Sequence, residues 1–324
     1  MPNTPPLNIA VWSPGAHARK NTIPAIISCP DTRLVGVLAR DQVKSASVAD
    51  EFNCQYWSSA QAMLEDEQVD GVYIASPVGL HFEQGMEVIR HKKHLLCEKS
   101  LTGSYAETKR LAEAAQNAGV LLAECFMYLY HAQFRQLQVL LAEAPIGHIH
   151  QIDACFGYPQ LDPGNIRYDK SLGGGALLDA GAYPLSALLA IMGQAPVDSH
   201  GFTFTDEGFE VDTRGALLCR FGDGVTGRAS WGMGLDYRSY IEIWGSAGSI
   251  RVNRAFAKPA ALDTSIVISR NGVEETLHTG QDNHFIKMFS HFAALADKPQ
   301  SISGQLTFSL QVAELVQMVS ANNN

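Results

Sequence analysis

The first third of the chain repeats one pattern, in which a short apolar run rich in β-branched residues is followed by a longer amphipathic run. The apolar runs predict strands at residues 8–12, 34–39, 71–76, 94–98 and 120–124, with a weaker signal at 55–57. The amphipathic runs predict helices at residues 42–52, 58–66, 80–91 and 104–118. Strands that alternate with helices of this length form a parallel sheet with helices on its faces. We therefore predict an α/β domain with a doubly wound parallel sheet.

A different pattern begins after Phe126, where most apolar runs are separated by turn residues such as Asn271-Gly272. Turns of this kind favour antiparallel hairpins. Strands are predicted at residues 148–157, 200–206, 214–221, 225–232, 239–244 and 265–270, and helices at 133–143, 176–192, 283–296 and 305–320. The tail, residues 321–324, is expected to fray. The change of pattern predicts two domains: residues 1–125, and residues 126–324 as an α+β domain with an open, mostly antiparallel sheet.

Composition narrows the class of protein. The chain has 324 residues, of which 46% are hydrophobic, enough for two buried cores. A net charge of −9 without a long basic run disfavours nucleic acid and anionic membrane as partners. The first six residues lack the features of a secretory signal, and no later stretch is expected to be apolar for long enough to cross a bilayer. We therefore expect a cytoplasmic protein that acts on small molecules.

The sequence does not indicate a metal or disulfide site. The six cysteines are scattered without a C-x-x-C pair, so buried reduced thiols are expected. His148 and His150 alternate on a predicted strand but lack a third ligand at metal spacing. We therefore predict no metal in the site.

The turn after the first predicted strand keeps the spacing of the phosphate loop G-x-G-x-x-A, with serine in place of its first glycine. Its residues are Ser13, Pro14, Gly15, Ala16, His17 and Ala18. The free N–H groups at a helix N-terminus would bind a pyrophosphate there, and Gly15 would let the ligand approach the backbone closely. A plain tight turn explains the same six residues, so this segment alone leaves both interpretations open.

The end of the second predicted strand bears on the choice of nucleotide. Dinucleotide folds usually place an acidic residue there to bind the ribose 2′-hydroxyl, whereas this strand ends in Arg40-Asp41. A guanidinium pairs with a 2′-phosphate, so Arg40 favours NADP over NAD. NAD remains the alternative if Arg40 is only a solvated surface residue and Asp41 turns towards the ribose.

Three further runs resemble signatures of a known family. They are 75–81 (Ala-Ser-Pro-Val-Gly-Leu-His), 97–101 (Cys-Glu-Lys-Ser-Leu) and the glycine-rich 173–184, and 243–250 resembles a sheet segment of the same family. The chain is similar to the glucose-fructose oxidoreductase / inositol dehydrogenase (Gfo/Idh/MocA) family over nearly its whole length. The resemblance implies a Rossmann-type first domain, NAD(P)-dependent oxidoreductase activity, and a cofactor site that also includes Ser76, Pro77, His81, Glu98 and Lys99.

The chain departs from the family pattern at Ser13 and at Ser100. In the family a proline, often after a cis peptide bond, stands where Ser100 stands here. A cis bond before a residue other than proline costs about 3 kcal/mol, so we expect the Lys99-Ser100 bond to be trans.

Hydride transfer at a carbinol carbon needs a protein group that gives or takes the oxygen proton. Lys99 directly follows a predicted core strand, at the sheet edge where open α/β sheets bind ligands. Asp179 and Tyr183 are four residues apart and share one face of a predicted helix, which Pro184 kinks or restarts. In a subset that resembles dimeric dihydrodiol dehydrogenases and nucleotide-sugar 3-ketoreductases, a tyrosine at this position implies that Tyr183 is the general acid and Lys99 its partner. Asp179 is expected to orient the substrate.

The expected substrate is a sugar, keto-sugar or related polyol. The side chains expected to bind it are Tyr128, Tyr158, Asn165, Arg167, Asp179 and Tyr183. Dihydrodiol or aldose 1-dehydrogenase activity is an alternative within enzymes, and a regulatory protein that senses NADP(H) without turnover is an alternative outside them. We also expect a homodimer or higher homo-oligomer, formed through an apolar sheet face that includes Trp231, Tyr240 and Trp244.

Overall fold

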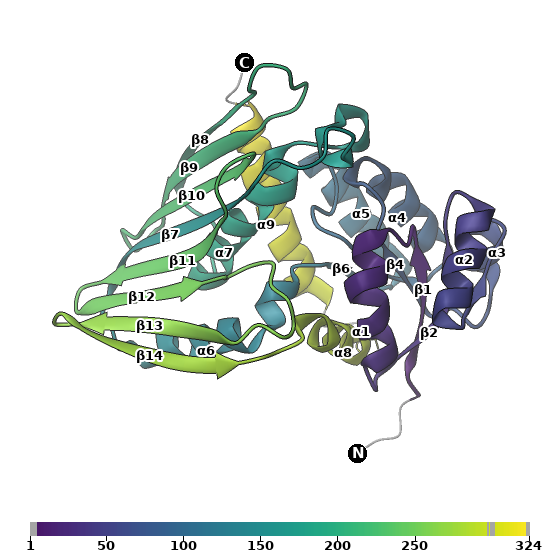
Figure 1. The fold of residues 1–324 in the computed structure, drawn as a ribbon, viewed down its shortest axis with the longest axis horizontal. Coiled ribbons are helices and arrows are strands. Elements are labelled where there is room, and N and C mark those ends of the chain that lie inside the picture. Colours follow the sequence, from purple (N-terminus) through teal and green to yellow (C-terminus); the bar gives the residue numbers. More distant parts are fainter. Residues whose placement is uncertain (1–4, 297, 299–301, 322–324) are drawn as a thin grey trace. The chain divides into compact units, whose positions relative to one another are not determined.

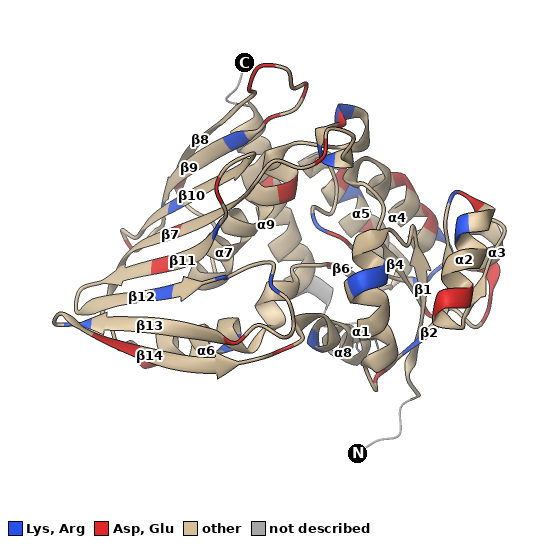
Figure 2. Cartoon of the chain, in the orientation of Figure 1, with Lys and Arg blue, Asp and Glu red and all other residues tan. Residues whose placement is uncertain are grey.

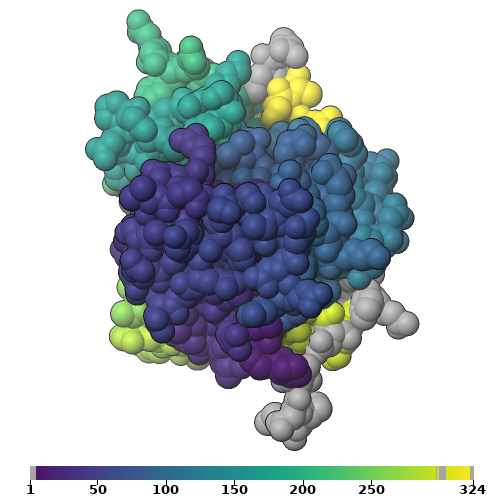
Figure 3. All heavy atoms as spheres, turned by 90° about the vertical axis from the view of Figure 1, so that its right-hand side faces the viewer, coloured from purple at the N-terminus to yellow at the C-terminus, as the bar shows by residue number. Residues whose placement is uncertain are grey.

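The chain divides into two compact units (Figure 1). This computed structural model describes residues 5–296, 298 and 302–321. The first unit comprises Met1–Met127 and Phe285–Leu310, and the second comprises Tyr128–His284 and Gln311–Asn324. In Figure 3, the N-terminal residues of the first unit are coloured purple to blue. The tail residues 322–324 lie outside the described part of the chain.

A six-stranded parallel sheet forms the centre of the first unit, with the order β3-β2-β1-β4-β5-β6. Its strands are β1 (Leu7–Trp12), β2 (Thr32–Leu38), β3 (Gln55–Tyr56), β4 (Gly71–Ile74), β5 (His94–Cys97) and β6 (Leu122–Glu124). Its helices are α1 (Ile23–Ser28), α2 (Gln42–Phe52), α3 (Ala60–Glu65), α4 (His81–Arg90), α5 (Tyr105–Ala118) and α8 (His284–Ala296). The predicted doubly wound sheet is confirmed.

The strand order reverses at β1, which pairs with β2 on one side and with β4 on the other. Ligands of open α/β sheets bind beyond the carboxyl ends of the strands at such a reversal. The turns after β1 and β4 therefore mark the candidate cofactor site. α5, which follows β5, is fixed locally: the Ser104 hydroxyl accepts from the Glu107 amide at its start, and Gly119 ends it with φ 68°.

An eight-stranded sheet forms the second unit, with the order β14-β13-β12-β11-β7-β10-β9-β8. Its strands are β7 (Ile149–Tyr158), β8 (Asp198–Phe204), β9 (Arg214–Arg220), β10 (Thr226–Met233), β11 (Arg238–Gly245), β12 (Gly248–Asn253), β13 (Thr264–Arg270) and β14 (Val273–Gly280). Only the β7–β10 pair is parallel among these described strands, so the predicted open, mostly antiparallel sheet is confirmed.

Two of these strands were not predicted. β14 is an edge strand whose first four residues are all exposed, so it lacks the alternation of apolar and polar residues that reveals a half-buried strand. β12 follows β11 after a tight turn between Gly245 and Gly248, and its apolar signal is confined to Ile250 and Val252.

The remaining helices include α6 (Ala132–Glu143), α7 (Ala182–Met192) and α9 (Ile302–Ala321). α9 begins among residues of the first unit and ends among those of the second. The helix predicted at 176–192 is divided, because a π-helical turn (Leu177–Gly181) precedes α7. Pro184 lies in the first turn of α7, directly after the π-helical turn.

One segment is long and apolar enough to span a membrane, so the expectation that no stretch meets this test is wrong. The segment Lys170–Met192 meets that test, but 72% of its apolar window is buried inside the structure. A helix that is hydrophobic all round is also what a protein core needs. This segment, which includes α7, is therefore a core helix of the second unit.

The two faces of the second sheet differ. Trp231 is 3% exposed and packs against the turn at Gly181, where an added Cβ would lie 2.9 Å from its ring. Trp244, on the opposite face, is 62% exposed. The expectation that Trp231 contributes to an open apolar face is therefore wrong, because its register places it on the helix-covered side. Figure 2 shows acidic and basic residues interspersed along the strands and helices.

Candidate active site

The turn after β1 has the backbone geometry that a phosphate loop requires. Ser13, at the position of the missing glycine, adopts the left-handed conformation with φ 65°, and its amide donates to Leu38. The Gly15 amide donates to the Ser13 carbonyl at 2.7 Å, and helical turns begin at Ala16. An added Cβ on Gly15 would meet one atom within 4 Å, the Ser13 carbonyl oxygen. Ser13 to His17 therefore form an open turn at a helix N-terminus, as expected.

Arg40 and Asp41 have separate roles after β2. The Asp41 carboxylate caps α2 by accepting from the Val43 amide at 2.9 Å. Arg40 is exposed and has no hydrogen bond or ion pair among the described residues. The carboxylate is thus engaged by its own helix, and the guanidinium is available to an anionic ligand.

Three polar residues from three elements meet beyond the carboxyl ends of β1 and β5. Glu98 accepts a hydrogen bond from the Tyr73 hydroxyl at 2.5 Å, and His17 Nε2 lies 3.7 Å from the same carboxylate oxygen. The Tyr73 side chain is fully buried, and burial, with the Glu98 charge, holds its pKa well above the ordinary value. The structure thus joins His17 of the loop after β1 to Glu98, the neighbour of Lys99.

Lys99 is half-buried at the end of β5, and the Lys99-Ser100 peptide bond is cis. The expectation of a trans bond is therefore wrong. The two residues after Lys99 form hydrogen-bonding contacts. The Ser100 carbonyl contacts His81, and the Leu101 amide donates to Glu124 at 2.8 Å. The serine keeps the turn geometry that the resemblance attributes to proline.

The sequence assigned no role to Glu124, the last residue of β6. Its carboxyl group is buried, and burial raises its pKa to about 7. Its Oε1 accepts from the Leu101 amide, two residues after Lys99. An acidic residue at the carboxyl end of a predicted core strand was the signal that could have identified it.

Ser76 and Pro77 form the turn after β4. The Ser76 side chain is buried, and its hydroxyl donates to Gln84 Oε1 at 2.7 Å. His81, the first residue of α4, is 0% exposed and contacts backbone carbonyl groups through both ring nitrogens. The fold thus encloses His81 completely.

In the second unit, the Asp179 carboxylate accepts hydrogen bonds from two of the expected substrate-binding side chains. Asp179 Oδ2 accepts from the Tyr158 hydroxyl at 2.5 Å and from Arg167 Nε at 2.8 Å. The Asp179 charge raises the pKa of Arg167, and burial with the same charge raises that of Tyr158. The glycine-rich turn permits this arrangement, since an added Cβ on Gly174 would lie 2.5 Å from the Arg167 carbonyl oxygen.

Tyr183 lies beside this cluster at the start of α7 and contributes to the raised pKa of Arg167. It is 5% exposed. Its ring lies 5.1 Å from that of Phe156 and 5.5 Å from that of Phe256. The aromatic rings fix the position of its phenol.

Two expected substrate-binding residues have structural contacts. Tyr128 is fully buried and shares a 2.9 Å hydrogen bond with Ser186, and burial raises its pKa. The Asn165 side chain accepts from the Arg167 amide at 3.1 Å and so caps the short helical turn that carries Arg167. Tyr128 therefore lies in the core beneath Tyr183, and Asn165 orients Arg167.

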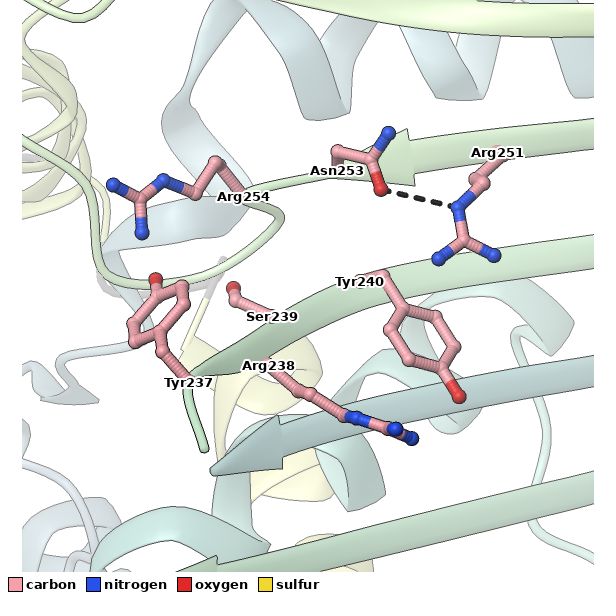
Figure 4. A pocket seen from close by; sticks show the side chains of 7 residues that line it. All are labelled: Tyr237, Arg238, Ser239, Tyr240, Arg251, Asn253 and Arg254. Atoms are coloured by element: carbon pink, nitrogen blue, oxygen red, sulfur yellow. Dashed lines mark hydrogen bonds between the residues drawn. The ribbon is translucent and has the colours of Figure 1, made fainter. Parts of the chain in front are cut away.

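A pocket of about 500 Å³ lies on β11 and β12 of the same unit (Figure 4). It is lined by Tyr237, Arg238, Ser239, Tyr240, Arg251, Asn253 and Arg254. The Arg254 guanidinium lies 4.5 Å over the Tyr237 ring, and that ring is 6.5 Å from Phe156, the neighbour of Tyr183. Arg251 forms an ion pair with Glu242, whereas Arg238 and Arg254 have no acidic partner among the described residues. The pocket suits an anionic group and was not predicted from the sequence.

No group of three or more His, Cys, Asp or Glu side chains in the described part of the chain could hold a metal ion. The open turn at the strand-order reversal and the polar groups around Lys99 are instead typical of a dinucleotide-dependent oxidoreductase.

Comparison with known proteins identifies the family. Residues 7–126 match the model of the oxidoreductase family with an NAD-binding Rossmann fold, GFO_IDH_MocA, and residues 134–251 match the GFO/IDH/MocA C-terminal domain. The chain belongs to this family, so it is an enzyme, an oxidoreductase that uses a nicotinamide dinucleotide.

Two curated relatives and one solved structure are informative. The chain is 34% identical to dTDP-3,4-didehydro-2,6-dideoxy-α-D-glucose 3-reductase of Saccharopolyspora spinosa over 89% of this chain and 87% of that protein. It is 30% identical to D-xylose 1-dehydrogenase (NADP⁺) 2 of Haloferax volcanii over 73% of each. KijD10, a 3-ketoreductase from Actinomadura kijaniata in complex with NADP and TDP-benzene, matches 99% of this chain and 98% of its own with a TM-score of 0.92 and 30% identity. KijD10 has also been solved with a tyrosine replaced by phenylalanine and with a lysine replaced by alanine.

Proposed function

We propose that this enzyme is an NADPH-dependent reductase of a keto sugar that is linked to a nucleoside diphosphate. The observation that carries the proposal is the match of nearly the whole chain, at about one third identity, to a named 3-reductase of a dTDP-linked sugar. The proposal assigns the cofactor to the first unit and the substrate to the second.

We propose that Lys99 and Tyr183 act together on the carbonyl oxygen. The lysine and the tyrosine replaced in the KijD10 variants are separated by the same number of residues as Lys99 and Tyr183. Both types of side chain hold protons that they can share with an oxygen. The spacing supports a common role for the pair.

Bound NADPH supplies the hydride that reduces the carbonyl carbon. The Tyr183 phenol donates its proton to the carbonyl oxygen, and the Lys99 ammonium stabilises the resulting phenolate. The aromatic rings of Phe156 and Phe256 hold the Tyr183 phenol in one position, which lowers the entropy lost at the transition state. Asp179 orients Arg167 and Tyr158 towards the hydroxyl groups of the sugar.

Arg40 supports the choice of NADP. Its guanidinium is exposed and without an acidic partner among the described residues, while Asp41 is engaged as the cap of α2. A free arginine at this strand end suits a 2′-phosphate. A 2′-hydroxyl would instead need the carboxylate.

We further propose that the pocket on β11 and β12 binds the diphosphate of the substrate. Arg254, which has no acidic partner among the described residues, lies over the Tyr237 ring, and that ring is 6.5 Å from Phe156, which contacts Tyr183. Arginine is well suited to phosphate groups because its planar fork forms two hydrogen bonds at once. This pocket favours a nucleotide-linked sugar over a free sugar.

Aldose 1-dehydrogenase activity is the second candidate, which the similarity to the xylose dehydrogenase supports. The two functions are distinguished by incubating the enzyme with NADPH and the dTDP-linked keto sugar of the first relative, or with NADP⁺ and D-xylose, and following the nicotinamide absorbance. We expect turnover with the nucleotide-linked sugar. Turnover with free D-xylose alone would contradict the proposal.

The diphosphate pocket has its own test. Arg254→Ala is expected to raise KM for the nucleotide-linked sugar about 10- to 100-fold with kcat nearly unchanged, because it removes binding that is equal in the ground and transition states. Arg270→Ala, an exposed arginine on β13 that pairs with Glu275, is the matched control. An unchanged KM in Arg254→Ala would contradict the proposal that this pocket binds the diphosphate.

We propose that the enzyme works in the cytoplasm as a homodimer or higher homo-oligomer. All six cysteines are unpaired and five are buried, which suits a reducing compartment. The open face of the second sheet carries the exposed side chains of Phe202, Leu218 and Trp244, and apolar patches of this kind are usually covered in an assembly.

A further inference from the structure

Asp212 lies at the start of the helical segment that carries Asp179 and Tyr183. Its Oδ2 accepts from the Leu177 amide at 2.7 Å, and its main-chain carbonyl accepts from the Ala176 amide at 2.8 Å. Both amides belong to the first turn of the segment, where the helix itself offers no carbonyl group to accept from them. One residue thus binds two of the N–H groups at this helix end.

Asp212 also fits closely against the glycine-rich turn before the segment. Gly175 has φ 123°, a conformation that side chains rarely adopt, and an added Cβ there would lie 2.3 Å from Asp212 Oδ1. The Gly175 amide donates to the Arg167 carbonyl at 2.9 Å. The turn is therefore bound both to Asp212 and to the main chain of Arg167, so it cannot shift without the loss of a contact.

Asp212 is itself anchored to the sheet. The amide of its neighbour Thr213 donates to the Phe204 carbonyl of β8 at 2.8 Å, and the Thr213 carbonyl accepts from the Met233 amide of β10 at 2.7 Å. Burial raises the pKa of Asp212 to about 6, although the hydrogen bonds from main-chain amides lower it, so the group is mostly ionised at pH 7. A carboxylate is also favoured at the positive end of a helix dipole.

The π-helical turn Leu177–Gly181 is held at both ends. Asp212 binds its first amide, and its last residue packs against the Trp231 ring. Asp179 lies within this turn, and Tyr183 follows two residues after it. Turns of this type recur at functional sites. The contacts of Asp212 therefore fix the main chain from which both side chains extend.

We propose that Asp212 is a positioning residue for the reduction, which sets the places of Tyr183 and Asp179 by binding the start of the turn that leads to them. The role rests on the proposed function, since it affects catalysis only if these two side chains act on the substrate. Asp212 acts through main-chain amides, so the role requires no contact with the substrate or the cofactor.

The first test compares two replacements of Asp212 in folded enzyme. Asp212→Ala removes the acceptor of the Leu177 amide, and we expect kcat to fall about 100-fold, because small displacements of a reacting group have effects of this size. Asp212→Asn keeps an oxygen that accepts from this amide, so kcat should return to within about fivefold of wild type. NADPH affinity should change less than about twofold in both variants, because the cofactor is assigned to the first unit.

Asp223→Ala, at the exposed turn between β9 and β10, is the matched control and should behave as wild type. If Asp212→Ala does not fold, Asp212→Glu takes its place, because its extra methylene pushes the carboxylate against Gly175. Normal kcat in the folded variant would overturn the positioning role. A loss in Asp212→Asn as large as that in Asp212→Ala would overturn it as well, since the acceptor is then not what matters.

The second test needs no sugar substrate, so its outcome is separate from that of the proposed substrate class. Hydrogen–deuterium exchange of peptides that cover residues 177–183 should be at least about tenfold faster in Asp212→Ala than in the wild type, because the turn opens more often. Asp212→Asn should exchange as slowly as the wild type, and α4 of the first unit should exchange equally in all three proteins. Equal exchange of residues 177–183 in Asp212→Ala and the wild type would overturn the proposal.

Discussion

The Tyr158 hydroxyl donates a hydrogen bond to Asp179 Oδ2 at 2.5 Å, and Arg167 Nε donates to the same oxygen at 2.8 Å. Burial raises the pKa of Tyr158, and the Asp179 carboxylate raises it further, because a phenol beside a negative charge resists losing its proton. Tyr158 therefore remains a neutral hydrogen-bond donor during the reaction. Arg167, held by the same carboxylate, remains charged.

This relationship predicts unequal effects of mutation within the cluster. Asp179→Asn removes the charge that orients both Arg167 and Tyr158, and kcat/KM is expected to fall about 10- to 100-fold, the size of a hydrogen bond to a charged group. Tyr158→Phe removes one neutral donor and should lower kcat/KM less than about tenfold. Steady-state kinetics on both variants provide the measurement. A larger loss in Tyr158→Phe than in Asp179→Asn would contradict the assignment of Asp179 as the orienting group.

Arg40 should determine the choice between NADPH and NADH. Its exposed guanidinium has no acidic partner among the described residues, so a 2′-phosphate would gain a charge-assisted contact of about 1.5–3 kcal/mol. Arg40→Ala is expected to weaken NADPH binding about 10- to 100-fold and to leave NADH binding nearly unchanged, as measured by titration calorimetry. Arg33→Ala, an exposed arginine at the opposite end of the same strand, serves as the control. Equal affinities of the wild type for NADPH and NADH would contradict a role of Arg40 in the choice of cofactor.

The sequence predicted elements whose signal is periodic. α2 was predicted at its observed bounds, because Asp41 caps its start and the amphipathic run continues to Phe52. β14 was missed because an edge strand exposed on both faces has no apolar alternation. Trp231 and Trp244 look alike in the sequence, and only the register of their strands separates a buried from an exposed ring.

The positions of site residues could be predicted where they directly follow a strand. Contacts between residues that are distant in the chain could not. The phosphate turn and Lys99 follow strands directly, so their edge of the sheet could be predicted. The hydrogen bonds of Asp179 to Tyr158, and of Glu124 to Leu101, join distant segments. No local pattern encodes such pairs, because they depend on which strands become neighbours.

Glu124 should make the stability of the enzyme depend on pH. Its folded pKa of about 7 lies above the ordinary value of 4.5, so the folded state binds its proton more tightly than the unfolded state does. The free energy of unfolding should therefore be greatest below about pH 4.5 for this group. It should fall by up to about 3 kcal/mol as the pH rises to about 7, and then level off.

Glu124→Gln isolates this contribution, since the amide oxygen can still accept from Leu101. The difference in unfolding free energy between variant and wild type, from urea titrations at pH 5 and pH 7.5, should increase in favour of the variant at the higher pH. A difference that is independent of pH would contradict a raised pKa for Glu124.

The exposed apolar face of the second sheet should form the interface between copies of the chain. Leu218 is 55% exposed on this face, and Leu218→Glu would place a charge in a buried interface. Light scattering at micromolar concentration should give a dimer or larger assembly for the wild type and a smaller species for Leu218→Glu. Val43→Glu, at an exposed position on α2 in the first unit, should leave the mass unchanged. A monomeric wild type would refute the prediction.

Lys99 and Tyr183 should behave as one proton-transfer unit. Lys99 follows β5 at the edge of the sheet where the dinucleotide is expected, and Tyr183 is held by aromatic rings at the start of α7. Tyr183→Phe should lower kcat by about 10²- to 10⁴-fold with little change in NADPH affinity, since a general acid acts only in the chemical step. Lys99→Ala should be similarly damaging.

The double variant separates a joint role from two independent ones. If the Lys99 ammonium stabilises the Tyr183 phenolate, removal of either side chain disables the same step, and the double variant should lose far less than the product of the two single losses. Single-turnover kinetics on all four proteins provide the measurement, with circular dichroism to verify folding. Near-normal kcat in Tyr183→Phe together with an inactive Lys99→Ala would assign the role of proton donor to Lys99 alone. Tyr183 would then only position the substrate.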